Sequence, residues 1–309
     1  MYEYDYKKYA NLHNWLNPNS QDCAEFNFYH DKNNEYHKNF YKSQNEEIVD
    51  GYTIVKNIDI ENQDNGGEPF EYKYNVDGFR SQHFENFKSD DVNILFSGCS
   101  WTEGTGLPQD MVWSSLLTEK IKELHPNENV EAYNVGVGGA SIPLVFKNTL
   151  AFLRKYDKVD YLYMLLPGFD RTSSLEYSAH DGVNPGFRKI VYVSPEDKIF
   201  KIPTIKKFVL NYEPGNAMYT MLPMIKAIED ICALKGIKLY WGTWVIWDQP
   251  AYEDFDFYNY VKIPYWERMD VPGAVIDKTY MTIASDGGHP GLDHNIKISN
   301  AFYEATVNG

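Results

Sequence analysis

Short apolar runs alternate with longer amphipathic segments from residue 91 to the end of the chain. The apolar runs predict buried strands at residues 93–97, 130–135, 160–166 and 238–246. Between and after these runs, apolar residues recur at helical spacing and predict helices at residues 110–124, 143–156, 217–234 and 293–306. This alternation predicts an α/β fold in which a parallel sheet carries helices on both faces.

The first 90 residues lack this rhythm. Nine of the first 45 residues are Asn, and no helical or strand period is sustained there. A short strand is expected at residues 52–58, and another within residues 71–80 that runs into an Asp-Gly turn. Because the segment has too little apolar material for a core of its own, we expect residues 1–90 to form an irregular extension packed on a main domain at residues 91–309. The main domain is expected to contain insertions at residues 167–215 and 250–272.

The first predicted strand of the main domain is followed by the segment SGCSWTEG, residues 97–104, which contains Ser100. Ligands of open α/β sheets bind at the carboxyl ends of the strands, so function is sought in such segments. Glycines on both sides allow Ser100 to sit in a tight turn with an exposed hydroxyl, at a helix start that favours developing negative charge. Alternatively, Ser100 is an ordinary helix N-cap.

Two further segments hold residue types that a reactive serine would need. Residues 136–139, after the second strand, are Gly-Val-Gly-Gly, and backbone N–H groups there can approach a ligand as an oxyanion hole or a phosphate cradle. Near the carboxyl terminus, Asp286 precedes His289 across two glycines, a spacing that lets the carboxylate orient the imidazole. Taken alone, each of these two segments is more simply a tight turn.

Together and in this order, the three segments resemble the motifs of the SGNH (GDSL-type) hydrolase family. Residues 98–104 look like its first block, GDSxTxG, with Cys99 where the family usually has Asp. Residues 134–139 are similar to the second block, and residues 286–289 match the DxxH block. Residues 75–80 look like a lead-in found in some members, and the first 70 residues have no counterpart in the resemblance.

The resemblance implies a three-layer α/β/α, flavodoxin-like fold with a serine hydrolase site. In the family's pattern, Ser100 is the nucleophile, His289 is the general acid and base, and Asp286 orients His289. Backbone N–H groups of Ser100 and Gly139 form the oxyanion hole.

The third family block departs from the pattern at Phe169, which stands where the family has an Asn that donates to the oxyanion. Phenylalanine cannot donate a hydrogen bond. Either Arg171 supplies the missing donor, or the enzyme is weakened and Phe169→Asn should raise its turnover, or the fold serves binding only. Alternatively, Arg171 pairs with Asp170 or another carboxylate at the surface. Substrate contacts are expected from Trp101, Phe169 and Asp170.

Charge and composition narrow the possible partners. The 44 acidic and 29 basic residues give a net charge of −15, which disfavours nucleic acid and anionic membrane surfaces as partners. No apolar run approaches the ~18 residues of a membrane span, and the amino terminus lacks a secretory-signal pattern, so we expect a soluble protein, cytoplasmic or virion-associated. The three cysteines and eight histidines show no metal-site spacing, so neither a metal nor a cofactor is expected.

These observations favour a serine ester hydrolase that removes small acyl groups, acetyl above all, from a carbohydrate or another small ester. Aromatic residues make up 16% of the chain and suit sugar contact, whereas no apolar tunnel for a long acyl chain is evident. One alternative is a non-catalytic binding or structural protein on the same scaffold, such as a phage-particle component or a glycan-recognition module. Another is a phosphate-binding doubly wound domain, which would use residues 136–139 but leave Ser100 and His289 without a role.

Overall fold

The computed structural model describes residues 46–56, 69–169, 171, 174–175, 187–188, 214–246, 248–255, 257–266, 281–286 and 288–309. Expectations for Asp170, for residues 1–45 and for most of the insertion at residues 167–215 therefore lie outside the described residues. In that insertion, the structure describes the two-residue strands β7 (Ser174–Leu175) and β8 (Phe187–Arg188), which pair antiparallel.

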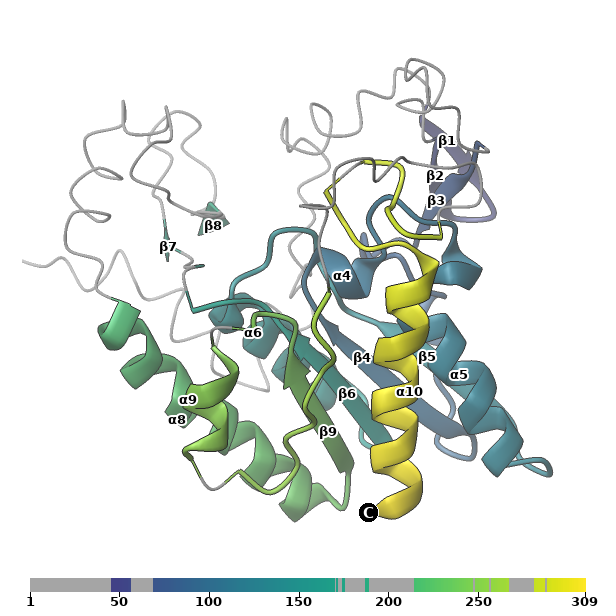
Figure 1. Ribbon diagram of the computed structural model, residues 1–309. Coiled ribbons are helices and arrows are strands. Elements are labelled where there is room, and N and C mark those ends of the chain that lie inside the picture. The colour runs from purple at the N-terminus through teal and green to yellow at the C-terminus, as the bar shows by residue number, and fades with distance from the viewer. Residues whose placement is uncertain are drawn as a thin grey trace, which may run out of the picture.

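A four-stranded parallel sheet forms the centre of the molecule (Figure 1). Its strands, in the spatial order β5-β4-β6-β9, are β5 (Val130–Asn134), β4 (Val92–Gly98), β6 (Tyr161–Leu166) and β9 (Lys238–Thr243). Every residue of β4 and β6 is buried, as expected for parallel strands covered on both faces. The four strands confirm the four predicted from the apolar runs, and β9 ends at Thr243, short of the predicted residue 246.

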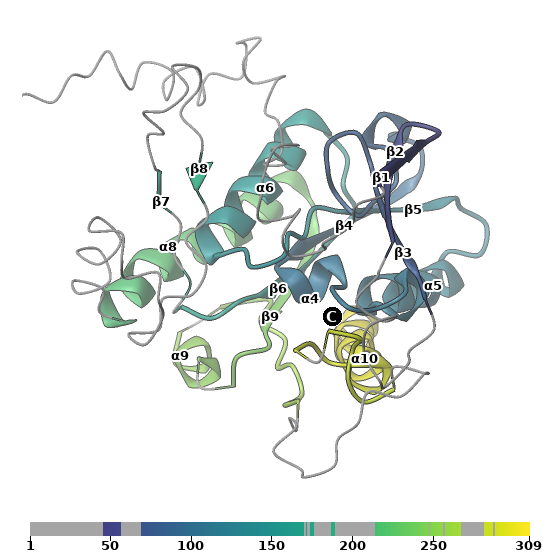
Figure 2. The same ribbon diagram turned by 90° about the horizontal axis from the view of Figure 1, so that it is seen from above.

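Helices cover both faces of this sheet (Figure 2). One face carries α5 (Trp113–Leu124) and α10 (Leu292–Asn308), and the other carries α6 (Ile142–Lys155) and α8 (Pro214–Lys235). The three layers and the strand order, which matches the first four strands of a flavodoxin-like sheet, confirm the predicted fold class.

Two helical segments differ from the prediction. The helix expected at residues 110–124 is interrupted at Val112, whose extended backbone separates the 3-10 helix η4 (Gln109–Met111) from α5. Within the insertion expected at residues 250–272, the chain forms the short helix α9 (Gln249–Glu253), which has Pro250 in its first turn, a position that suits proline.

The N-terminal region contains a second sheet, in the order β1-β2-β3. Its antiparallel strands are β1 (Glu46–Val49), β2 (Tyr52–Lys56) and β3 (Glu71–Tyr74). The strands expected at residues 52–58 and within residues 71–80 correspond to β2 and β3, whereas β1 was not expected. The turn between β1 and β2 is Asp50–Gly51 with φ of 50° and 78°, as type I′ hairpins require, and Asp-Gly is a strong signal for that turn.

The short helices α4 (Ser100–Glu103) and η3 (Phe84–Asn86) complete the described elements. No helix in the described ranges is long and apolar enough to cross a membrane.

Candidate active site

Ser100 lies at the carboxyl edge of the central sheet, where β4 passes into α4. Gly98 permits this junction, because a Cβ at that position would come within 2.6 Å of the Leu165 carbonyl oxygen and would also meet the Thr102 side chain. Cys99 is extended and Ser100 begins the helix, so the Ser100 N–H has no intrahelical acceptor. The local sequence therefore presents both the hydroxyl and the N–H of Ser100 at the helix start.

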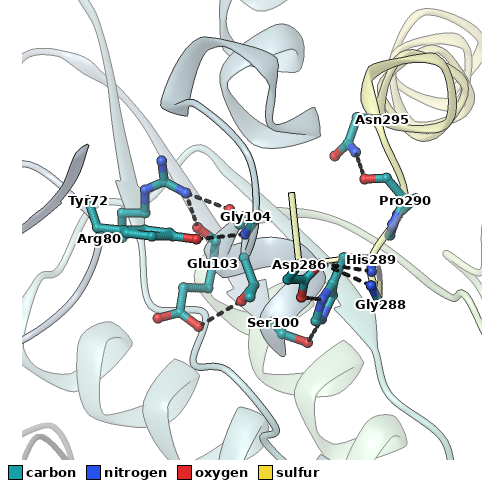
Figure 3. A network of polar contacts seen from close by, with 12 residues as sticks. Tyr72, Arg80, Ser100, Glu103, Gly104, Asp286, Gly288, His289, Pro290 and Asn295 are labelled. Atoms are coloured by element: carbon teal, nitrogen blue, oxygen red, sulfur yellow. Dashed lines mark hydrogen bonds and ion pairs between the residues drawn. The ribbon is translucent and has the colours of Figure 1, made fainter. Parts of the chain in front are cut away.

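The structure brings Ser100, His289 and Asp286 together, although 189 residues separate the first two (Figure 3). The His289 Nε2 atom lies 2.8 Å from Ser100 Oγ, and His289 Nδ1 lies 2.5 Å from Asp286 Oδ2. The Asp286 Oδ1 atom accepts hydrogen bonds from the N–H groups of Gly288 and His289, each at 3.1 Å. Both carboxylate oxygens are thus engaged, and the two ring nitrogens of His289 face Ser100 and Asp286.

Asp286 is held in its charged form. Burial alone would raise the pKa of this carboxyl, but the hydrogen bond from His289, the His289 charge and the two backbone N–H groups outweigh it. The net effect is a pKa below the ordinary value. A charged carboxylate against Nδ1 favours the tautomer that carries its proton there and leaves Nε2 free to accept a proton from Ser100.

The glycine-rich turn after β5 lies against α4. The Asn134 side chain donates to the Thr102 carbonyl at 2.6 Å and accepts the Gly136 N–H at 2.8 Å. The Val137 N–H donates to Gly98 O at 3.2 Å, which ties the turn to the end of β4. Gly139 has a φ of 63°, which favours glycine there. The turn therefore lies beside Ser100, and the role of the Gly139 N–H as oxyanion donor remains a prediction.

Phe169 lies in the core, so the structure does not support it as a substrate contact. Its side chain is 2% exposed and packs against Tyr252, with ring centroids 5.0 Å apart. Its N–H donates to Asp248 at 2.9 Å. An apolar ring is more stable among apolar neighbours than in contact with water. Phe169, which stands where the resemblance would place an Asn, is therefore a residue of the core.

Arg171 lies over the ring of Trp244, with its Cζ 5.2 Å from the ring centroid. Its Nη1 is buried and has no hydrogen-bond partner, and the described part of the chain places no carboxylate within ion-pair distance of it. No ion pair of Arg171 occurs among the described residues, and the alternative partner Asp170 lies outside them. At least Nη1 of the guanidinium therefore has no partner among the described residues.

Trp101, the residue after Ser100, is the centre of an aromatic cluster that consists of Trp101, Trp244, Trp266 and His294. Trp101 and Trp244 are stacked with centroids 4.5 Å apart, and Trp266 and His294 each meet Trp101 edge-on at 5.6 Å. Burial and the Lys297 charge lower the pKa of His294 to about 4, so this imidazole is neutral near pH 7. Trp101 is only 6% exposed, whereas Trp244 and Trp266 are half-buried.

Sequence reasoning did not select Trp244, although it directly follows β9 at the carboxyl edge. It also did not select Tyr72 and Arg80, which contact the segment after α4. The signal for Trp244 was its place after a strand, and the signal for Arg80 was the lead-in segment at residues 75–80.

A well-defined cleft among the described residues lies elsewhere. Its volume is about 560 Å³, and residues of β3, α5 and β5 line it, while Ser100, Asp286 and His289 do not. No group of three or more His, Cys, Asp or Glu that could hold a metal ion occurs in the described ranges. The site around Ser100 is therefore identified by its polar geometry rather than by cavity size.

No family model matches the chain, and no curated protein matches it. Several solved structures are similar to it. A putative lipolytic protein of the G-D-S-L family from Desulfitobacterium hafniense DCB-2 is 10% identical, with a TM-score of 0.41 over 70% of this chain and 99% of that one. The psychrotrophic esterase EstA from Pseudoalteromonas sp. is 12% identical, with a TM-score of 0.40 over 71% and 98%.

The lipase Lip_vut3 from a goat rumen metagenome is 14% identical, with a TM-score of 0.41 over 69% of this chain and 97% of that one. At these identities and TM-scores, the likeness carries no argument about activity. The functional assignment therefore depends on the geometry around Ser100.

Proposed function

We propose that the protein is a serine ester hydrolase of the SGNH type. The observation that carries this proposal is the pair of contacts made by His289, with Nε2 at 2.8 Å from Ser100 Oγ and Nδ1 at 2.5 Å from Asp286 Oδ2. A serine paired with a base that a third group orients is the arrangement that activates a hydroxyl as a nucleophile.

In the proposed reaction, Ser100 Oγ attacks the acyl carbon while His289 Nε2 takes its proton. The tetrahedral oxyanion is stabilised by the N–H groups of Ser100 and Gly139, with Arg171 as the third donor in place of the missing Asn. His289 then returns the proton to the leaving alkoxide, which leaves an acyl group on Ser100. Water activated by the same imidazole hydrolyses this acyl-enzyme and regenerates the free serine.

The proposed substrate is a small acyl ester, acetyl above all, of a carbohydrate or another small alcohol. Ser100 is only 6% exposed, which favours a compact acyl group over a long chain. The rings of Trp244 and Trp266 beside Trp101 are only half-buried, and partly exposed aromatic rings are of the kind that sugars contact. The catalytic groups of the proposed reaction are all side chains or backbone N–H groups of this chain, and water is the second substrate.

Hydrolysis of p-nitrophenyl acetate tests the proposal, because a triad with an intact oxyanion hole should release acetate from an activated ester. Ser100→Ala should lower turnover to the background rate. Ser115→Ala is the matched control, since Ser115 lies on α5 and its hydroxyl accepts only from Gln109 among the described residues. If wild type hydrolyses the ester no faster than Ser100→Ala and both remain at the background rate, a non-catalytic protein that keeps the hydrolase scaffold is favoured.

A further inference from the structure

Residues 104–107 join the helix that carries Ser100 to the loop that carries Asp286. The N–H groups of Gly104 and Thr105 donate to the Ser100 carbonyl at 2.9 and 3.0 Å. The Gly106 carbonyl accepts the Ser285 N–H at 2.9 Å. A Cβ on Gly106 would lie 2.9 Å from Asp286 Oδ1, so the backbone there is in close contact with the carboxylate. Movement of this segment therefore moves Ser100 and Asp286 relative to each other.

The N-terminal region holds the same segment from its other side (Figure 3). The Tyr72 hydroxyl of β3 accepts the Gly106 N–H at 2.7 Å. Arg80 donates to three backbone carbonyls, those of Glu103 at 3.3 Å, Gly104 at 2.6 Å and Leu107 at 2.8 Å. Two side chains thus fix three backbone groups of residues 104–107 and the adjoining Glu103 carbonyl at the end of α4.

The charged guanidinium of Arg80 is buried and is surrounded by backbone carbonyls and an aromatic ring. The side chain is 2% exposed, and the described part of the chain offers it no carboxylate within ion-pair distance. A buried guanidinium is costly unless hydrogen bonds and nearby electron-rich groups compensate it. Here the three carbonyls accept from Nη1 and Nη2, and the Tyr72 ring centroid is 4.5 Å from Arg80 Cζ, whereas the buried Nε has no hydrogen-bond partner among the described residues. Burial also raises the pKa of Tyr72, which keeps the hydroxyl protonated.

We infer that Tyr72 and Arg80 are positioning residues for the reaction at Ser100. By holding residues 104–107, they set the distance between the nucleophile and the Asp286–His289 pair, so the N-terminal region is part of the active-site framework. This inference rests on the proposed esterase function. Rates depend steeply on such geometry, and a displacement of about 1 Å can cost about 100-fold in turnover.

Tyr72→Phe tests the inference, with Tyr52→Phe as the matched control. Each substitution removes the hydroxyl of a tyrosine in the N-terminal sheet. The Tyr72 hydroxyl accepts the Gly106 N–H, and the Tyr52 hydroxyl accepts the His83 N–H. Of these two hydroxyls, the one on Tyr72 is bonded to residues 104–107. Tyr72→Phe should therefore lower kcat for p-nitrophenyl acetate at least about tenfold, with KM changed less than about twofold. Tyr52→Phe should leave kcat within about twofold of wild type.

Arg80→Lys is the second variant, because a single ammonium on a flexible stem cannot serve three carbonyls in the place of a planar fork. It should also lower kcat at unchanged KM, whereas Arg154→Lys, at an exposed position of α6, should not. Thermal unfolding measured alongside ensures that all rates are compared well below the melting temperature.

The two possible failures are distinguishable. If wild type hydrolyses the ester through Ser100 and Tyr72→Phe and Arg80→Lys match their controls in kcat, the positioning role is overturned while the esterase function stands. A loss of kcat that only follows the fraction of unfolded protein overturns it as well. If wild type shows no Ser100-dependent hydrolysis, the proposed function fails and the inference fails with it.

Discussion

Replacing Asp286 with Asn changes one oxygen of the carboxylate to an NH₂ group at nearly the same volume. In the wild type, Oδ1 accepts two backbone N–H groups and Oδ2 faces His289 Nδ1. The single oxygen of the amide must remain against the two N–H donors, so the NH₂ group is directed at Nδ1. Nδ1 then has to accept, which places the imidazole proton on Nε2, facing Ser100. The variant therefore selects the tautomer that cannot take the serine proton.

The expected loss in kcat is about 10⁴-fold, or about 5.4 kcal/mol of activation free energy, the size found when this tautomer is imposed on a serine triad. The assay is steady-state hydrolysis of p-nitrophenyl acetate near pH 7 with folded variant protein. Asp293→Asn is the control, since Asp293 is an exposed carboxylate in the first turn of α10. If Asp286→Asn keeps kcat within about tenfold of wild type, Asp286 does not orient the catalytic imidazole.

Four further predictions follow from the same geometry. Arg171→Ala should lower kcat by about 10²–10³-fold with little change in KM if Arg171 is the third oxyanion donor, and steady-state kinetics with an unchanged kcat would remove that role. Phe169→Asn should destabilise the protein by about 3–5 kcal/mol in urea unfolding and bring no gain in turnover, because the ring is buried against Tyr252; a faster variant would show that the Asn reaches the site. The lowered pKa of Asp286 means that its carboxylate stabilises the fold above the unfolded pKa of about 3.9, and that this stability is lost as the pH falls through the still lower folded pKa. Unfolding free energies of wild type and Asp286→Asn should therefore converge at low pH, and a constant difference would contradict the shift. Finally, hydrolysis should survive EDTA, and loss of activity that one divalent ion restores would indicate metal-activated water instead of a serine nucleophile.

The central sheet could be predicted from the sequence because its strands are continuous apolar runs bounded by turn residues. β4 and β6 are of this kind, and their positions were predicted to within one residue at each end. The N-terminal sheet was not predicted as a sheet. Its strands are short, β1 is exposed and β2 and β3 are only partly buried, and the pairing of β2 with β3 is a long-range contact that local periodicity does not encode.

The site was partly predictable for a similar reason. Ser100 follows a strand, and Asp286 and His289 lie in a glycine-containing segment before the last helix; in both segments the turn chemistry and the order of the motifs are visible in the sequence. The core position of Phe169 was not predictable, because it depends on contact with Tyr252 from a segment about 80 residues away. The lead-in segment at residues 75–80 marks Arg80 in the sequence, but the three carbonyls that it contacts are seen only in the folded structure.

The most direct test of the account is labelling with a fluorophosphonate, which reacts only with a serine whose hydroxyl is activated. Peptide mass spectrometry of the treated wild type should find one adduct, on Ser100, and His289→Ala should abolish it because the base that activates the hydroxyl is gone. No adduct on Ser100, or equal labelling of Ser100 in wild type and His289→Ala, would contradict the assignment of Ser100 as a nucleophile activated by His289.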